Sequence, residues 1–189
     1  MPPEKRPAGN VPPIKPTSVP GATSFAPSGP QKGLYLRKQD LRRGIELMFF
    51  AYRDFTGEAD QILSELGLGR AHHRVIYFVG RQPDMSVSDL LAILKITKQS
   101  LSRVLGHLID AGYIQQTQGV RDKRQRLLAL TEKGAALEAK LTDVQCRRFA
   151  AAYSARGGTA VDGFVKVLSS LLDEEIRANL RLQYPEHID

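Results

Sequence analysis

Residues 86–131 read SVSDLLAILKITKQSLSRVLGHLIDAGYIQQTQGVRDKRQRLLALT. Two residues in this segment, Ser86 and Thr97, are of the types that cap helix N-termini. Each precedes apolar residues at helical spacing, so the segment predicts one short helix over 87–94 and a second over 98–111. Two helices joined by so short a connection have the geometry of a helix-turn-helix.

The second predicted helix has an apolar face and a polar face. The apolar stripe consists of Leu101, Val104, Leu105, Leu108 and Ile109, and the residues on or beside the opposite face are Gln99, Ser100, Ser102, Arg103 and His107. An α-helix fits the major groove of DNA, where each base pair shows a distinct pattern of donors and acceptors. Gln99 can pair with N6 and N7 of adenine, and Arg103 can pair with O6 and N7 of guanine.

The start of this helix offers further contacts to DNA. The side chains of Lys98, Ser100 and Ser102 can reach bases or phosphates. The N-terminal turn that begins at Thr97 also presents free backbone N–H groups, which bind phosphate. We therefore expect these residues to form part of a DNA contact surface.

A basic hairpin is predicted directly after the second helix. Two short strand-like runs, 113–118 and 125–130, flank a tip with one glycine and mostly basic side chains. Helix, turn, helix and basic hairpin are the order of a winged helix-turn-helix. The hairpin residues expected to contact DNA are Arg121, Lys123, Arg124 and Arg126. One of them can enter a narrow minor groove, where the negative potential is enhanced.

Long helices are predicted on both sides of this region. Apolar residues recur at three- and four-residue steps over 38–66, a length of roughly 40 Å at 1.5 Å per residue. Such a helix is longer than a small core needs, so we expect its surplus apolar face to pack against a second copy of the chain. A short, largely buried helix is predicted over 70–80.

The C-terminal part is predicted to hold two long helices. Thr131 is a good N-cap for the first, and Gly157 and Gly158 break the pattern before a last helix over 159–182. The side chains of this last helix expected to face inward are Phe164, Val167, Leu168, Leu171 and Ile176. The predicted fold class is mainly α with a small β-wing, a winged helix-turn-helix domain with N- and C-terminal dimerisation helices.

The N-terminus has a different composition from the rest of the chain. Nine of the 11 prolines fall in the first 30 residues, among Gly, Ser, Thr and Ala. This composition predicts a disordered, basic tail over 1–33 and one domain over 34–189. Within the domain we assign the DNA-binding core to about 70–131 and dimerisation helices to about 38–66 and 131–182. The net charge of +7 favours a polyanionic partner.

Composition also argues against several classes of protein. A single cysteine, Cys146, excludes an internal disulfide framework and a multi-cysteine metal site. No apolar run is long enough to span a membrane and no secretory signal is recognisable, so a cytoplasmic location is expected. No nucleophile with its base, phosphate loop or metal cluster is visible. We therefore expect no enzymatic activity, no cofactor and no metal.

Motifs in this segment resemble those of the MarR family of bacterial regulators, and the resemblance runs from about Leu34 to the C-terminus. The most specific match is Asp122, any residue, Arg124, five residues, then Leu130 and Thr131. The stretch TEKG that begins at Thr131 is a common continuation in the family, and ITKQSL and LIDAGYI match the two ends of its recognition helix. Within the family, GRAHHRVIYFVG and ITKQSL are similar to the PetP-type regulators, which are linked to photosynthetic electron-transfer genes.

The resemblance implies how the protein works. It implies a homodimer built from the first and last helices that binds a near-palindromic operator in double-stranded DNA, often as a repressor released by a small ligand. Arg124 would enter the minor groove and Asp122 would orient it. His72 and His73 lie in a region where related proteins hold ligands, although the simpler reading is one packed and one exposed histidine.

Two alternatives stay open at this point. A winged helix can bind other proteins through its second helix, and then binding would lack the steep salt dependence of phosphate contacts. A redox-responsive regulator would use Cys146, whose neighbours Arg147 and Arg148 would lower its pKa. A structural role for this cysteine is the simpler reading, since unpaired cysteines usually behave as small apolar residues.

Overall fold

The computed structural model describes residues 36–119 and 123–183, with side chains to residue 180. The chain divides into two compact units, one ending at Phe50 and the other beginning at Ala51. The predicted tail over 1–33 lies outside the described residues. So do Arg121 and Asp122 in the predicted wing.

One long helix, α1 (Lys38–Glu65), begins in the first unit and confirms the helix predicted over 38–66. Its first turn carries an ion pair in which Nε of Arg37 lies 3.0 Å from Oδ2 of Asp40. The hydrogen bond from this guanidinium lowers the pKa of Asp40. Large apolar side chains of the first unit are exposed to solvent: Ile45, Leu47, Met48 and Phe49.

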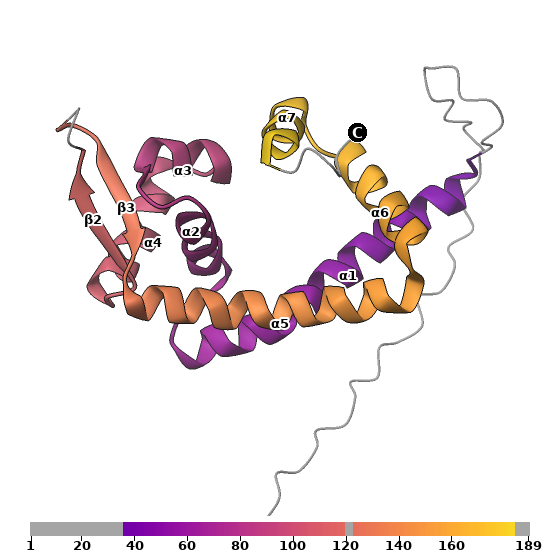
Figure 1. Cartoon of the computed structure of the whole chain (residues 1–189), viewed down its shortest axis with the longest axis horizontal. Coiled ribbons are helices and arrows are strands. Elements are labelled where there is room, and N and C mark those ends of the chain that lie inside the picture. Colours follow the sequence, from indigo (N-terminus) through magenta and orange to yellow (C-terminus); the bar gives the residue numbers. More distant parts are fainter. Residues whose placement is uncertain (1–35, 120–122, 184–189) are drawn as a thin grey trace, which may run out of the picture. The chain divides into compact units, whose positions relative to one another are not determined.

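The second unit contains most of the helices and all the strands of the described residues. Its elements in chain order are the end of α1, α2 (Arg70–Arg81), β1 (Met85–Ser86), α3 (Val87–Leu94), α4 (Lys98–Asp110), β2 (Ile114–Gln118), β3 (Arg126–Leu130), α5 (Glu132–Arg156), α6 (Gly158–Ser170) and α7 (Glu174–Gln183). Figure 1 shows α2, α3, α4 and the strands gathered at the N-terminal end of α5.

Side-chain caps begin α3 and α4, as the sequence predicts. The hydroxyl of Ser86 accepts a hydrogen bond from the backbone N–H of Asp89 at 3.1 Å, and the Asp89 carboxylate accepts one from the backbone N–H of Ser86 at 3.0 Å. This reciprocal capping box satisfies two helix-end donors that would otherwise lack partners. Residues close together in the sequence therefore determine where the helix-turn-helix begins.

The sheet has three antiparallel strands in the order β1-β3-β2. Ile114 pairs with Leu130 at one end of the hairpin and Gln118 with Arg126 at the other, so the two predicted strands are confirmed. The third strand, β1, in which Met85 pairs with Leu128, is not predicted from the sequence. Two residues are too short a strand to show an alternating pattern, and only the pairing with β3 defines it.

Helix α2 supplies the centre of the core. Val75, Ile76 and Val79 are fully buried, and the helix packs against α3, α4, α5 and β3. Burying one such side chain stabilises the fold by about 1.5–3 kcal/mol. The predicted burial of the segment 70–80 is therefore confirmed, and α2 is the support on which the helix-turn-helix rests.

The last predicted helix, over 159–182, is wrong as a single element, because the chain breaks between α6 and α7. The backbone N–H of Arg177 bonds to the carbonyl of Asp173 at 3.0 Å, which starts α7. Nε of Arg177 donates to the carbonyl of Ser169 and Nη2 to that of Leu172, both at 3.0 Å. This side chain satisfies carbonyls that the end of α6 leaves open.

The prediction that the apolar side chains of the segment 159–182 face inward is also wrong for a single chain. Phe164, Val167 and Leu171 are exposed by 40%, 64% and 69%. Leu168 and Ile176 are half-buried. A large apolar surface of α6 is therefore left uncovered by the described residues of this chain.

Because Gly134 has no side chain, the start of α5 lies directly against the backbone that follows α4. A Cβ atom at this buried position would overlap the backbone carbonyl oxygen of Tyr113, which cannot swing away as a flexible side chain would. At Gly106, inside α4, an added Cβ would meet nothing within 4 Å. The two glycines thus differ in packing although both lie in helices.

We predict that Gly134→Ala lowers the free energy of unfolding by about 1–3 kcal/mol, because the backbone must shift to admit the methyl group. Gly106→Ala is the matched control and should raise it by about 0.5–1 kcal/mol, since alanine favours helix. Urea denaturation followed by circular dichroism measures both. Equal stability of the two variants would contradict the close approach.

Candidate nucleic-acid interface

Helix α4 buries one face and exposes the other. Leu101, Leu105 and Leu108 are buried in the core shared with α2. On the other face Gln99 and Arg103 are exposed. Lys98 and Ser102 are exposed as well. The predicted division of this helix is confirmed, and its donor and acceptor groups are accessible to a ligand.

The first turn of α4 uses two of the predicted contact residues for capping. The hydroxyl oxygen of Thr97 accepts a hydrogen bond from the backbone N–H of Ser100 at 3.2 Å and donates one to the Ser100 hydroxyl at 2.9 Å. Ser100 is half-buried. These side chains therefore hold the helix start in place, and the exposed residues beside them are better situated for a base contact.

The end of α4 is held by the start of α5. The hydroxyl of Thr131 donates to the carbonyl of Gly112 at 2.7 Å, and Nζ of Lys133 donates to the carbonyl of Ala111 at 2.8 Å. The Lys133 ammonium also lies 4.3 Å from the centre of the Tyr113 ring, a cation–π contact. The prediction that Thr131 caps α5 is confirmed, since its hydroxyl also accepts the N–H of Gly134 at 3.0 Å. The contacts of Thr131 and Lys133 to the end of α4 could not be read from the TEKG motif that contains both residues.

The hairpin places its basic side chains in solvent. Gly119 donates its N–H to the carbonyl of Gln125 at 3.1 Å, which continues the pairing toward the tip. Lys123, Arg124 and Arg126 are exposed. Arg121 and Asp122 lie outside the described residues, so the role of Asp122 in orienting Arg124 stays a prediction.

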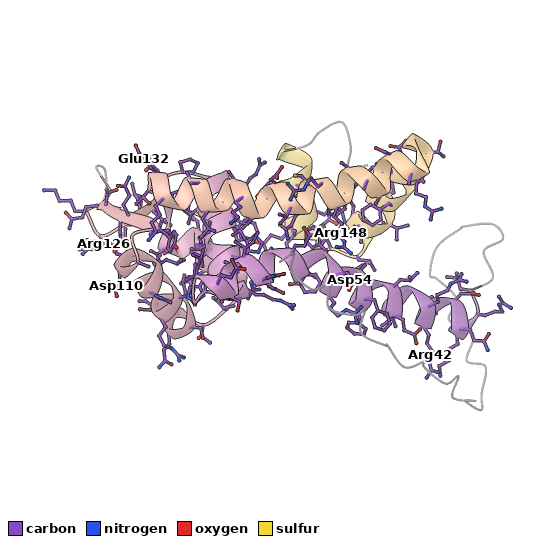
Figure 2. The ribbon with its side chains drawn as sticks, turned by 90° about the horizontal axis from the view of Figure 1, so that it is seen from below. Arg42, Asp54, Asp110, Arg126, Glu132 and Arg148 are labelled. Carbon is purple, nitrogen blue, oxygen red and sulfur yellow. The ribbon has the colours of Figure 1, made fainter. Side chains whose placement is uncertain are left out.

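The hairpin and the end of α4 lie at one end of the second unit. Figure 2 shows Arg126 of β3 at the same end as Asp110, the last residue of α4, and Glu132, the first of α5. The hairpin thus stands beside the recognition helix. This arrangement offers a helix and a basic loop to one extended ligand.

One basic residue of the helix-turn-helix is engaged elsewhere. Nζ of Lys95, in the turn between α3 and α4, lies 2.8 Å from Oδ2 of Asp173. The hydrogen bond between them raises the pKa of Lys95 and lowers the pKa of Asp173. Both side chains are largely exposed, so this pair adds little stability but reduces the positive charge of the turn.

The predicted ligand residues His72 and His73 differ in their surroundings. Nδ1 of His72 accepts a hydrogen bond from the backbone N–H of Gly69 at 3.1 Å, and its Nε2 lies 3.0 Å from Nδ1 of His107. The two rings are nearly perpendicular, at 85°. His107 lies 35 residues further along the chain, and no sequence signal could have joined it to His72.

His73 is half-buried in a different environment. Burial lowers its pKa, while the carboxylates of Asp60 and Glu138 act in the opposite direction. Neither His72 nor His73 lines the surface hollow of about 370 Å³ in the second unit, whose lining residues are Arg53, Asp54, Gly57, Glu58, Gln61 and Arg148. A ligand site at the two histidines stays a prediction.

Cys146 is exposed on α5. Its two basic neighbours contact carboxylates, since Arg147 pairs with Asp143 and Arg148 lies 4.0 Å from Glu58. The part of the chain that the structure describes contains no group of three metal-ligating residues. Within the same residues, no helix is both long and apolar enough to cross a membrane. A redox role for Cys146 stays an alternative prediction.

Comparison with known proteins gives consistent matches. Residues 66–125 match the MarR family. The chain is 48% identical over 161 residues to the HTH-type transcriptional regulator PetP of Rhodobacter capsulatus, a match that covers 85% of this chain and 96% of that protein. This relative agrees with the subgroup indicated by GRAHHRVIYFVG and ITKQSL.

Solved structures share the fold. A MarR family transcription regulator superposes with a TM-score of 0.62 at 18% identity, over 75% of this chain and 93% of that chain. FabT of Streptococcus pneumoniae, crystallised in complex with DNA, superposes with a TM-score of 0.51 at 21% identity, over 75% and 90%. At these identities the likeness establishes the arrangement of helices and wing.

Proposed function

Because this chain belongs to the MarR family and is thus a DNA-binding transcription regulator, not an enzyme, we propose that it binds a near-palindromic operator as a homodimer. Helix α4 lies in the major groove and the wing reaches the adjacent minor groove. The observation that carries this proposal is the exposed polar face of α4 next to a basic hairpin. Its exposed groups are Lys98, Gln99, Ser102, Arg103, Lys123, Arg124 and Arg126.

The chemistry of each exposed group indicates which part of the DNA it contacts. The amide of Gln99 and the guanidinium of Arg103 form paired hydrogen bonds with adenine and guanine, respectively. Lys98 and Ser102 contact phosphates or bases. Backbone N–H groups in the first turn of α4, which follows Thr97, contact phosphate. In the wing, Arg124 enters the minor groove while Lys123 and Arg126 contact the backbone.

Dimerisation explains the uncovered apolar surfaces. Phe49 in the first unit is exposed by 70%, and Val167 and Leu171 in the second unit by more than half. Large exposed apolar patches on soluble proteins often mark interaction sites, and a second copy would cover those of each unit. A two-fold dimer presents two recognition helices, which is why the operator is a near-palindrome.

The output proposed from family membership is repression that a small ligand relieves. A ligand that binds one conformation of the dimer more tightly shifts the population toward it, and DNA affinity changes accordingly. A transcription assay on a mapped operator tests this output. Repression by the protein alone is expected, and activation would contradict it.

We predict that Arg124→Ala weakens operator binding and reduces by about 1 the magnitude of the negative slope of log affinity against log salt, because one cationic contact in the minor groove is lost and fewer counterions are released. Fluorescence anisotropy with a duplex found by genome-wide mapping measures both quantities. Arg147→Ala, which removes the same charge from α5, is the matched control and should leave them unchanged.

If Arg124→Ala binds like the parent protein, the wing has no part in the mechanism. If the parent protein's affinity does not depend on salt, phosphate contacts are absent and the protein-binding alternative is favoured.

We predict that Val167→Glu shifts the protein from dimer to monomer, because a carboxylate buried in an apolar interface loses its hydration. Sedimentation velocity at micromolar concentration measures the shift. Lys166→Glu, on the adjacent exposed position of α6, is the control and should stay dimeric. A dimeric Val167→Glu protein would exclude this surface of α6 from the interface.

A further inference from the structure

The pair of imidazoles between α2 and α4 has a defined protonation state. The backbone N–H of Gly69 can only donate, so Nδ1 of His72 carries a lone pair and the ring proton resides on Nε2. That Nε2–H points at Nδ1 of His107, 3.0 Å away, which must then accept. His107 therefore carries its own proton on Nε2, and both rings are neutral.

The surroundings of His72 favour this neutral state. His72 is in the first turn of α2, where the positive end of the helix dipole disfavours a cation. Burial lowers the pKa of His72, and the imidazole of His107 lowers it further. The bond from Gly69 also caps α2, so a proton on Nδ1 would remove the cap as well as charge the ring.

The other charged groups near this pair are few. On α4, Arg103 and Asp110 stand one turn to either side of His107, and on α2 the neighbour His73 faces Asp60 of α1 and Glu138 of α5. Arg70, at the start of α2, is paired with Asp60 at 2.7 Å. Among the described residues no carboxylate is hydrogen-bonded to either ring, and Nδ1 of each ring already accepts an N–H, so a proton added to either ring displaces one of these bonds.

We propose that His72 is a positioning residue for the recognition helix, which it holds through His107 only while both imidazoles are neutral, so that acidification weakens operator binding. The inference rests on the proposed use of α4 in the major groove. Arg103 stands four residues before His107 on this helix, and a small tilt of α4 moves it relative to the bases.

The sign of the effect is distinctive. The hydrogen bonds that run from Gly69 through His72 to His107 are complete above the ordinary histidine pKa of about 6.5 and are lost as the pH falls below that value. A proton on Nδ1 of His72 removes the bond from Gly69, and a proton on Nδ1 of His107 removes the bond from His72. Simple electrostatics predicts the opposite, since an added positive charge near DNA strengthens binding. A loss of affinity in acid therefore distinguishes positioning from charge attraction.

The test measures operator affinity of the full chain by fluorescence anisotropy from about pH 8 to about pH 5.5, at constant ionic strength and with EDTA present. The affinity of the parent protein should fall by up to about tenfold per pH unit below about pH 6.5, the limit for the uptake of one proton. Circular dichroism at each pH confirms that the helices stay folded.

Two variants of His107 distinguish the loss of the hydrogen bond to His72 from the effect of added positive charge. His107→Asn keeps an acceptor near the position of Nδ1 that acid does not remove, so it should bind like the parent protein at about pH 8 and lose much less affinity in acid. His107→Leu cannot accept the bond, so its affinity should be reduced at every pH. Arg147→Ala, the control for DNA binding above, should follow the parent profile.

Nitrogen-15 spectra of the histidine rings give a readout that does not need DNA. At neutral pH both His72 and His107 should be the Nε2–H tautomer, with Nδ1 unprotonated. An Nδ1–H tautomer of His72, constant or rising affinity in acid, or a His107→Asn profile equal to the parent's would overturn the proposal. Absence of operator binding at about pH 8 with the tautomers as expected would instead contradict the proposed function.

Discussion

The recognition helix depends on a contact in which the backbone at Tyr113 lies directly against Gly134, with no space for a side chain between them. The carbonyl of Tyr113 also accepts a hydrogen bond from the N–H of Thr131 at 3.1 Å. Because β2 begins one residue after Tyr113, this contact fixes the end of α4, the base of the wing and the start of α5 together. The rest of the interface takes its orientation from this junction.

Local signals made much of this fold predictable from the sequence. The caps at Ser86 and Thr97 and the turn at Gly112 act within a few residues, so the helix-turn-helix and the wing could be recognised with nearly correct bounds. Contacts between distant residues could not. The strand β1 exists only through β3, and the break before α7 depends on a side chain several residues away.

The candidate site shows the same division. Periodicity identified the exposed polar face of α4, but not that Thr97 and Ser100 bond to each other or that Lys95 pairs with a carboxylate 78 residues away. The bond between His72 and His107 needs α2 and α4 to be packed first. Sequence reasoning thus finds which residues face solvent and leaves open which of them hold the scaffold.

We expect α4 and the wing to approach DNA from different grooves, and tethered cleavage tests this most directly. In a Cys146→Ser background, an iron–EDTA group attached at Gln99→Cys or Lys123→Cys cuts the operator strands nearest to it. Cuts from Gln99 should follow the pattern of a major-groove probe and cuts from Lys123 that of a minor-groove probe, repeated in both half-sites. Cleavage from Lys123 alone, or none from either position on a bound operator, would contradict the claim that α4 and the wing form the DNA interface.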